Sequence, residues 1–270
     1  MTLALTRELA ARLEGGMAAA NPRIMAALQE VAPDHPGAVL TRSGMTAVYG
    51  GDGFPLNEAV GVGMMGPVAP DLLDAIEAFY AGHHHASAIR VSSLAHPTAV
   101  SLTAARGYHL VEFSHRWVLD LKTWRPAREA PDPRVRAAEP PEELEWAQTM
   151  EAGFADTDSA PAGEALALSR AFFRMGGGAV PVIAREAGVA AACGMLDVDG
   201  EVAALFSGST RPAYRRRGLQ SALLDTRLRM AQARGCTIAT IETDPGSGSQ
   251  RNVERLGFQL AYAAASLRRP

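Results

Sequence analysis

The sequence has little cysteine and no long apolar run, and each shortage excludes a class of protein. Its two cysteines, Cys193 and Cys236, lack the spacing of metal ligands and are too few for a disulfide framework. No apolar run approaches the roughly 20 residues that a membrane-spanning helix needs. Charged residues interrupt the N-terminal segment MTLALTRELAARLEGG, where a secretion signal would be apolar. We therefore expect a cytoplasmic protein with no structural metal, no disulfide and no membrane partner.

Lysine is also scarce, and positive charge does not dominate. Lys122 is the only lysine, and the 270 residues carry 26 basic against 29 acidic side chains, a net charge of −3. A general nucleic-acid-binding surface needs an excess of positive charge, so we expect no nucleic-acid partner. A hydrophobic fraction of 47% is enough for a substantial core. At ~100–200 residues per domain, the length fits one large domain or two modest ones.

A proline-rich segment divides the chain. Residues 122–141, KTWRPAREAPDPRVRAAEPP, favour an extended connector because proline fixes φ and cannot donate to a sheet ladder. A weak repeat appears on its two sides, about 150 residues apart. Each copy reads as a strand, a proline-containing turn, a helix closed by Gly107 or Gly257, and a second strand that begins near Tyr108 or Phe258. We therefore expect two α/β domains, residues 1–122 and 133–270.

The second half has the clearer pattern of elements. Short apolar, β-branched segments separated by turn residues predict an antiparallel meander, and helical spacing of apolar residues follows it. The expected strands are 180–187, 189–198, 202–210 and 237–243, and the expected helices are 141–155, 163–175 and 219–234. This order predicts a mixed sheet covered by helices.

An arginine-rich loop stands between the third meander strand and the long helix. The segment RPAYRRRGLQSALL, residues 211–224, places four arginines before Gly218, at the expected start of the helix. A helix N-terminus exposes unpaired amides and carries about half a positive charge. Glycine lets an anion approach those amides, and arginine donors suit phosphate. The loop therefore fits a pyrophosphate or similar polyanion, with a solvated basic helix start as the alternative.

The loop resembles the pyrophosphate-binding loop of the GNAT N-acetyltransferase superfamily. Its pattern, Arg or Gln, two residues, Gly, one residue, then Gly or Ala, is met here except that Gln220 replaces the final small residue. The resemblance covers most of residues 133–270 and implies an α/β (α+β) fold of two tandem GNAT-like domains, each a mixed, mostly antiparallel sheet covered by helices. The first domain, which has no arginine between Val60 and Asp71, is expected to be a degenerate copy with a structural role.

The resemblance also implies acetyl-CoA as co-substrate and direct transfer of its acetyl group to an amine of a small molecule or peptide. The strand end before the loop would bind the pantetheine arm, and the loop amides would bind the pyrophosphate. The implied cofactor-binding residues are Gly208, Ser209, Thr210, Arg215, Arg216, Arg217, Gly218, Leu219, Gln220 and Ser221.

Catalytic groups are less well specified. The family often places a tyrosine acid four residues before the glycine of the final Gly-Phe pair, where this chain has Val253. Ser249 is a candidate acid and, like Ser247, fits a helix cap as well. Glu242 is the candidate base, with an exposed glutamate or an ion pair as the alternative. Asp156 and Asp158 follow the first helix, where the family recognises amines, and also fit a turn and cap.

Two other motifs are weaker indications of function. The string GVGMMG, residues 61–66, lacks the helix and the acidic residue of a dinucleotide site. His83, His84 and His85 fit a solvated helix end better than a metal site. A non-catalytic acyl-CoA sensor or scaffold is the alternative to an enzyme, and the sequence leaves the acceptor open. It leaves the oligomeric state open as well, including a homodimer.

Overall fold

One eleven-stranded sheet runs through the computed structural model, which describes residues 3–159 and 163–270. The strands are β1 (Ala38–Arg42), β2 (Met45–Tyr49), β3 (Ala59–Val60), β4 (Ser87–Ser92), β5 (His109–Asp120), β6 (Val135–Ala137), β7 (Val180–Glu186), β8 (Val189–Asp199), β9 (Val202–Thr210), β10 (Ile238–Thr243) and β11 (Gln259–Arg269). Their order across the sheet is β1-β2-β3-β4-β11-β5-β10-β9-β8-β7-β6. Only β3 with β4 and β9 with β10 pair in parallel among the described strands. The expected mixed, mostly antiparallel α/β architecture is confirmed.

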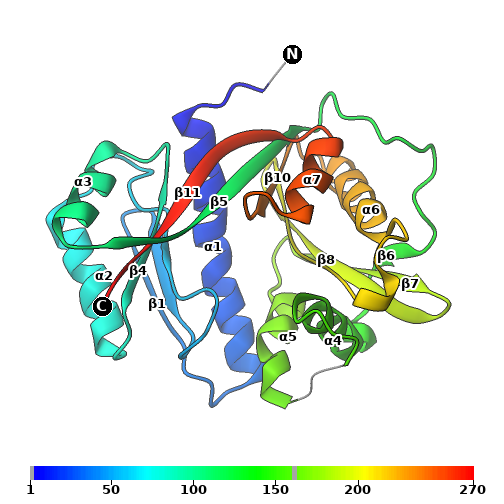
Figure 1. Ribbon diagram of the computed structural model, residues 1–270, viewed down its shortest axis with the longest axis horizontal. Coiled ribbons are helices and arrows are strands. Elements are labelled where there is room, and N and C mark those ends of the chain that lie inside the picture. Colours follow the sequence, from blue (N-terminus) through cyan, green and yellow to red (C-terminus); the bar gives the residue numbers. More distant parts are fainter. Residues whose placement is uncertain (1–2, 160–162) are drawn as a thin grey trace.

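Seven α-helices surround the sheet within the described residues. They are α1 (Arg7–Val31), α2 (Pro70–Gly82), α3 (Pro97–Ala105), α4 (Glu143–Phe154), α5 (Ala167–Arg174), α6 (Leu219–Ala233) and α7 (Gly248–Arg255). Figure 1 shows α2 and α3 at one end of the molecule, α4 to α7 at the other, and the long α1 between them. None of the described helices is long and apolar enough to cross a membrane.

The central strands exchange partners between the two halves of the sequence. The last strand, β11, lies between β4 and β5, and β5 in turn lies between β11 and β10. The repeated units β4–α3–β5 and β10–α7–β11 therefore each place their second strand between the two strands of the other unit (Figure 1). The two expected sheets are consequently joined into one. The boundary at residues 122–133 stays a prediction.

Glycine closes both repeated helices as expected. Gly107 and Gly257 have φ of 79° and 86°, which is the left-handed conformation that glycine adopts without strain. The aromatic residues that follow, Tyr108 and Phe258, are 9% and 5% exposed and pack in separate apolar clusters. The predicted repeat is therefore present in both sequence and structure.

Most element boundaries in the second half lie within a few residues of those expected. Two segments differ. The proline-rich connector contains β6, a proline-free stretch of three residues that pairs with β7 at the edge of the sheet. In the first half, the helix-like spacing of Arg7, Glu8, Arg12 and Glu14 indicates only the beginning of a helix, whereas α1 continues through Pro22 to Val31. Packing of α1 against α5 and β2 supports this length, since Ile24, Met25 and Leu28 lie in the core cluster that contains Phe172.

Candidate active site

The site begins where β9 and β10 separate. These strands pair in parallel only from Val202 to Leu205 and from Ile238 to Ile241. Beyond that point β9 carries a bulge opposite β8, and Ser207 in the bulge has a positive φ of 50°. A bulge bends its strand and breaks regular pairing. The sheet therefore opens here, between the ends of two strands that precede α6 and α7.

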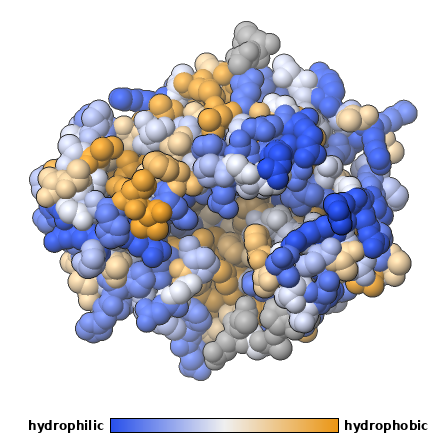
Figure 2. Space-filling model, in the orientation of Figure 1, coloured by the Kyte–Doolittle hydropathy of each residue, from blue (hydrophilic) through white to orange (hydrophobic). Residues whose placement is uncertain are grey.

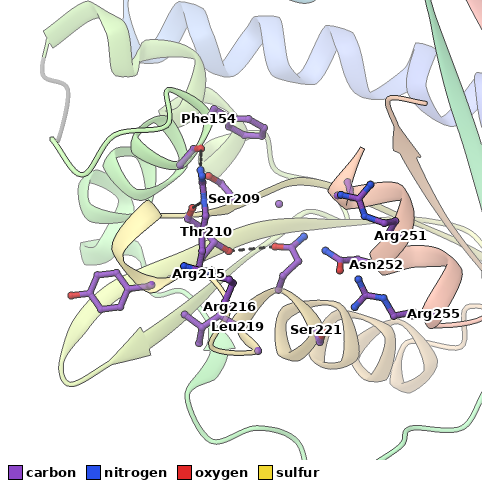
Figure 3. A pocket seen from close by; sticks show the side chains of 17 residues that line it. Phe154, Ser209, Thr210, Arg215, Arg216, Leu219, Ser221, Arg251, Asn252 and Arg255 are labelled. Carbon is purple, nitrogen blue, oxygen red and sulfur yellow. Dashed lines mark hydrogen bonds between the residues drawn. The ribbon is translucent and has the colours of Figure 1, made fainter. Parts of the chain in front are cut away.

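A cavity of about 770 Å³ lies on the α6 and α7 side of this opening (Figure 3). Nine of the ten predicted cofactor-binding residues line it, namely Gly208, Ser209, Thr210, Arg215, Arg216, Gly218, Leu219, Gln220 and Ser221. We call this cavity the cofactor cleft. The remaining predicted residue, Arg217, does not line it.

The loop geometry has a clear local cause. Gly218 precedes α6 with φ of 79°, and no side chain accepts a hydrogen bond from the first amides of α6. Arg216 also has a positive φ, 61°. Gln220, the departure from the family pattern, lies beside β9, with its Oε1 3.5 Å from the Thr210 hydroxyl. The larger side chain therefore leaves the N-terminus of α6 open to an anion.

The three consecutive arginines have different roles. Arg215 is held in place because it donates to the main-chain oxygens of Thr210 and Gly153 and pairs with Asp156. Arg216 lines the cleft and has no ion-pair partner among the described residues. Arg217 turns away and binds Glu186 at 2.7 Å. Of the three side chains, Arg216 is the one most available to a bound anion.

Asp156 and Asp158, considered for amine recognition, instead support the loop. Asp156 pairs with Arg215, while a side-chain oxygen of Asp158 accepts a hydrogen bond from the Ala213 amide at 3.3 Å. The main-chain oxygen of Asp158 also accepts from Arg211. Both residues thus connect the end of α4 to the arginine loop, as the turn interpretation predicted.

Three polar residues of α7 complete the cofactor cleft and were not singled out from the sequence. Arg251, Asn252 and Arg255 line the cleft opposite the loop, as Figure 3 shows. Arg251 and Arg255 are four residues apart and so share one face of the helix. The four-residue spacing of these arginines was the sequence signal that could have identified a basic face on this helix. Together with Arg215 and Arg216 they give the cleft four arginine side chains near the exposed N-terminus of α6.

A second cavity of about 460 Å³ lies on the α1 side of the same opening. We call it the inner pocket. It is lined by α1, by β9 and β10, and by Phe154 and Phe172 of α4 and α5. In the orientation of Figure 1, the space-filling view shows the molecule hollowed near its centre, with apolar residues at the base of the hollow (Figure 2).

The two cavities meet. Four residues line both of them, and they are Phe154, Gly208, Gln220 and Ser249. The shared boundary includes the β9 bulge, where a thioester held in the cofactor cleft would face the inner pocket. Ser249 lies at this boundary, whereas Ser247 accepts a hydrogen bond from the Gln250 amide at 3.1 Å and caps α7.

Glu242 lines the inner pocket, but it is not a free carboxylate. Arg90 pairs with it, and Arg116 lies 2.6 Å from its Oε2. Burial raises the pKa of Glu242, and the two guanidinium groups outweigh burial, so that its pKa is below the ordinary value. The ion-pair alternative is therefore present in the structure. A lowered pKa weakens Glu242 as a proton acceptor, and its assignment as the base stays a prediction.

Val253, at the position of the family's tyrosine, is fully buried in the core cluster that includes Phe258. It supplies no proton to the cofactor cleft. The three consecutive histidines also have structural surroundings, since His83 stacks on Tyr49 with ring centroids 4.5 Å apart. Across residues 3–159 and 163–270, no group of histidine, cysteine and acidic side chains is arranged to hold a metal ion.

Comparisons with known proteins agree with this geometry. Residues 141–258 match the model of the acetyltransferase (GNAT) family. A GCN5-related N-acetyltransferase from Kribbella flavida has a TM-score of 0.61 and 18% identity, with 95% of each chain covered. A tandem GNAT protein from the clavulanic acid biosynthesis pathway has a TM-score of 0.63 and 14% identity, over 92% of this chain and 87% of that one.

A GCN5-related N-acetyltransferase from Sphaerobacter thermophilus has a TM-score of 0.57 and 15% identity, over 86% of this chain and 75% of that one. At these identities the likeness concerns the fold. No curated protein matches the sequence. Residues 141–258, a little under half of the chain, thus match the acetyltransferase (GNAT) family model, and the chain shares its fold with tandem and other GNAT structures.

Proposed function

We propose that the protein is an N-acetyltransferase that moves the acetyl group of acetyl-CoA directly to an amine. The observation that carries this proposal is the junction of two cavities at the β9 bulge, with Gly208, Gln220 and Ser249 lining both. One cavity has an open helix N-terminus and arginines suited to phosphates, and the other has room for an acceptor. The junction brings the two reactants together, as direct transfer requires.

The proposed binding of acetyl-CoA follows from the cleft. The amides that begin α6 and the Arg216 guanidinium bind the pyrophosphate, since unpaired amides and arginine forks both suit phosphate oxygens. Arg251 and Arg255 supply further positive charge from α7. The pantetheine arm lies along Gly208, Ser209 and Thr210, and the separated strand offers it main-chain groups. The thioester then reaches the boundary at Gly208.

The proposed chemistry takes place at that boundary. The nitrogen of a neutral amine attacks the thioester carbon, the carbon–sulfur bond breaks, and the amine's proton leaves as the amide forms. Glu242 accepts a hydrogen bond from the amine or from the water that removes this proton. It can do so because its ion pairs with Arg90 and Arg116 keep its carboxylate negatively charged. Ser249 is the proposed donor to the leaving thiolate.

Calorimetric titration of acetyl-CoA tests the cofactor assignment, with Arg216→Glu and Arg217→Glu as matched variants. Both make the same charge change at adjacent positions, but only Arg216 lines the cleft. We expect Arg216→Glu to weaken binding by about a hundredfold, because it replaces a charge-assisted bond with repulsion. Arg217→Glu should change it severalfold at most. Equal losses in the two variants, or no binding by the wild type, would contradict the proposal.

The buried Val253 favours one other function, a non-catalytic acyl-CoA sensor or scaffold. Thiol release from acetyl-CoA with a panel of amines separates the two. Acetyl-CoA binding together with amine-dependent release of CoA supports the enzyme. Binding without release from any amine in the panel supports the sensor.

A further inference from the structure

The inner pocket contains information about the acceptor that the family resemblance does not. Its volume of about 460 Å³ lies in the lower part of the range typical of small-molecule sites, ~300–1,000 Å³. Helix α1, from the N-terminal half, forms one side, and β9 with β10 forms another. A partly open hollow of this size suits a compact molecule better than a polypeptide segment.

The walls of the pocket are largely apolar and aromatic. Phe154, Phe172 and Phe206 line it, and the rings of Phe172 and Phe206 meet edge-on with centroids 5.7 Å apart. Leu13 and Met17 of α1 also line the pocket. Phe154 is 60% exposed although it is large and apolar, and it lies at the boundary with the cofactor cleft. Such a surface gains most from an apolar partner.

Most charged side chains of the pocket are engaged in ion pairs. Glu242 is paired with Arg116 and Arg90, and Asp197 is paired with Arg23. Four carboxylates, those of Asp197, Asp199, Glu242 and Asp244, line the pocket against the guanidinium groups of Arg12 and Arg116. Arg23 and Arg90, which pair with two of these carboxylates, bring the count to four guanidinium groups against four carboxylates, so charge alone does not select the acceptor. The apolar lining offers no series of carboxylates for an extended polycation.

Asn21 gives the pocket a polar side chain that is open to a ligand. Its side chain lines the pocket and the residue is only 5% exposed. Among the described residues, its amide has no hydrogen-bond partner. A polar group in such a position is ordinarily satisfied. A ligand in the pocket would satisfy it.

We propose that the acceptor is a compact primary amine on an aromatic or branched apolar body. This inference rests on the proposed acetyltransferase function. The apolar body packs between α1 and the three phenylalanines, Asn21 hydrogen-bonds a polar group of the acceptor, and the amine lies near Glu242 and the bulge at Gly208. In the transfer, the amine nitrogen bonds to the acetyl carbon and the carbon–sulfur bond breaks; the amine's proton passes to water, the leaving sulfur takes its proton from Ser249, and water restores the proton of Ser249.

Thiol release with four probe amines tests the proposal in the full-length protein. The probes are 2-phenylethylamine, ethanolamine, glucosamine and spermidine. We expect kcat/KM for 2-phenylethylamine to exceed those of the other three by roughly tenfold or more, because only its body buries a ring. Preference for glucosamine or spermidine would overturn this inference while leaving the acetyltransferase intact. No release from any probe, or no binding of acetyl-CoA, would instead count against the proposed function.

Matched variants on α1 locate the acceptor. Ala20 lines the pocket, whereas the neighbouring Ala19 is exposed and does not. Ala20→Phe should raise KM for 2-phenylethylamine at least about tenfold, because the added ring occupies the pocket, and should leave KM for acetyl-CoA within about twofold. Ala19→Phe should change neither constant. Equal effects of the two variants would overturn the placement.

Asn21→Leu serves if Ala20→Phe fails to fold. The Asn21 amide has no protein partner, so its removal leaves no protein group newly unpaired. The variant should raise KM for an amine that also carries a hydroxyl, such as tyramine, about fivefold or more through loss of one hydrogen bond. KM for acetyl-CoA should stay unchanged. An unchanged KM for tyramine would contradict the assignment of Asn21.

Discussion

The guanidinium of Arg227 holds the main chain of Phe206, the residue that precedes the β9 bulge. Arg227 Nη1 donates to the Phe206 oxygen at 3.2 Å and to the Met195 oxygen of β8 at 3.0 Å. Arg227 is fully buried on α6, and burial lowers its pKa to about 10. It fits because Gly194 and Gly208 flank it, and a Cβ on Gly194 would lie 2.7 Å from Nη1. One buried cation thus fixes the point where the two cavities meet.

Replacing Arg227 should loosen the bulge. Arg227→Met removes the donors to Met195 and Phe206, so we expect the free energy of unfolding to fall by about 2–4 kcal/mol, at ~1–3 kcal/mol for each buried acceptor left unpaired. Weaker acetyl-CoA binding should accompany it. Urea unfolding and calorimetry measure both effects, with Arg234→Met, at the exposed end of the same helix, as the control. A change below about 0.5 kcal/mol in Arg227→Met would contradict this role.

The arginines of α7 should bind acetyl-CoA through charge. We expect Arg251→Ala and Arg255→Ala each to weaken binding by about tenfold, the equivalent of one charge-assisted hydrogen bond. Because salt screens exposed charges, the difference from the wild type should shrink as ionic strength rises. Titration calorimetry at low and high salt checks this. A loss that is the same at both salt concentrations would point to packing instead of charge.

The cofactor cleft was predictable because its signals are local. A strand, an arginine loop and a glycine at a helix start are consecutive in the sequence, and the structure gives Gly218 a left-handed φ of 79°. Arg217 was predicted to line the cleft but does not, because it forms an ion pair with Glu186, and that contact joins segments far apart in sequence. Arg251 and Arg255 were overlooked since a basic face on a short helix is typical of a solvated surface.

The inner pocket could not be predicted, because the residues that form it are far apart in the sequence. Its walls come from α1, β9 and β10, and its charge balance depends on Arg90 and Arg116 of two other strands. Apolar periodicity shows that a strand is buried, but not which strand lies beside it. The repeated units have similar patterns, so nothing local in them showed that β11 inserts between β4 and β5.

Glu242→Gln should separate the two roles of this carboxylate. We expect KM for the amine to rise about fivefold or more through loss of a charged acceptor, with a smaller change in kcat, because a lowered pKa makes Glu242 a weak base. A large fall in kcat with an unchanged KM would support the base assignment instead. Amine titrations in the thiol-release assay measure both constants.

The same variant should lose stability in a pH-dependent way. Removing the charge deprives Arg90 and Arg116 of their nearest carboxylate and leaves them only Glu58 at 3.8 Å and Glu14 at 3.9 Å, at a cost of about 3 kcal/mol. Because the folded pKa of Glu242 is below its unfolded value of 4.5, its contribution is complete above that pH and is lost as the pH falls through the folded pKa. The difference between wild type and variant in urea unfolding should therefore be larger at pH 7 than at pH 3.

Glu58 should behave in the opposite way. Burial raises its pKa to about 7, although Arg90 lies 3.8 Å away and lowers it. A carboxyl with a raised folded pKa binds its proton more tightly when folded, so stability falls as the pH rises from 4.5 to about 7. The full loss is roughly 3 kcal/mol. Glu58→Gln should remove most of this loss and stabilise the protein at pH 8 but not at pH 4. A variant less stable than wild type at pH 8 would contradict this.

The exchanged strands should make the two halves depend on each other for folding. Residues 133–270 produced alone would lack β4 and β5, leaving β10 without one neighbour and β11 without either of its two partners. Unpaired strand edges favour aggregation. We expect neither this half nor residues 1–122 to unfold cooperatively alone, and co-expression of the two to restore a cooperative transition and acetyl-CoA binding. Circular dichroism and calorimetry on the separate and co-expressed halves measure this. An isolated 133–270 segment that unfolds cooperatively and binds acetyl-CoA would instead establish residues 122–133 as the boundary of independent domains.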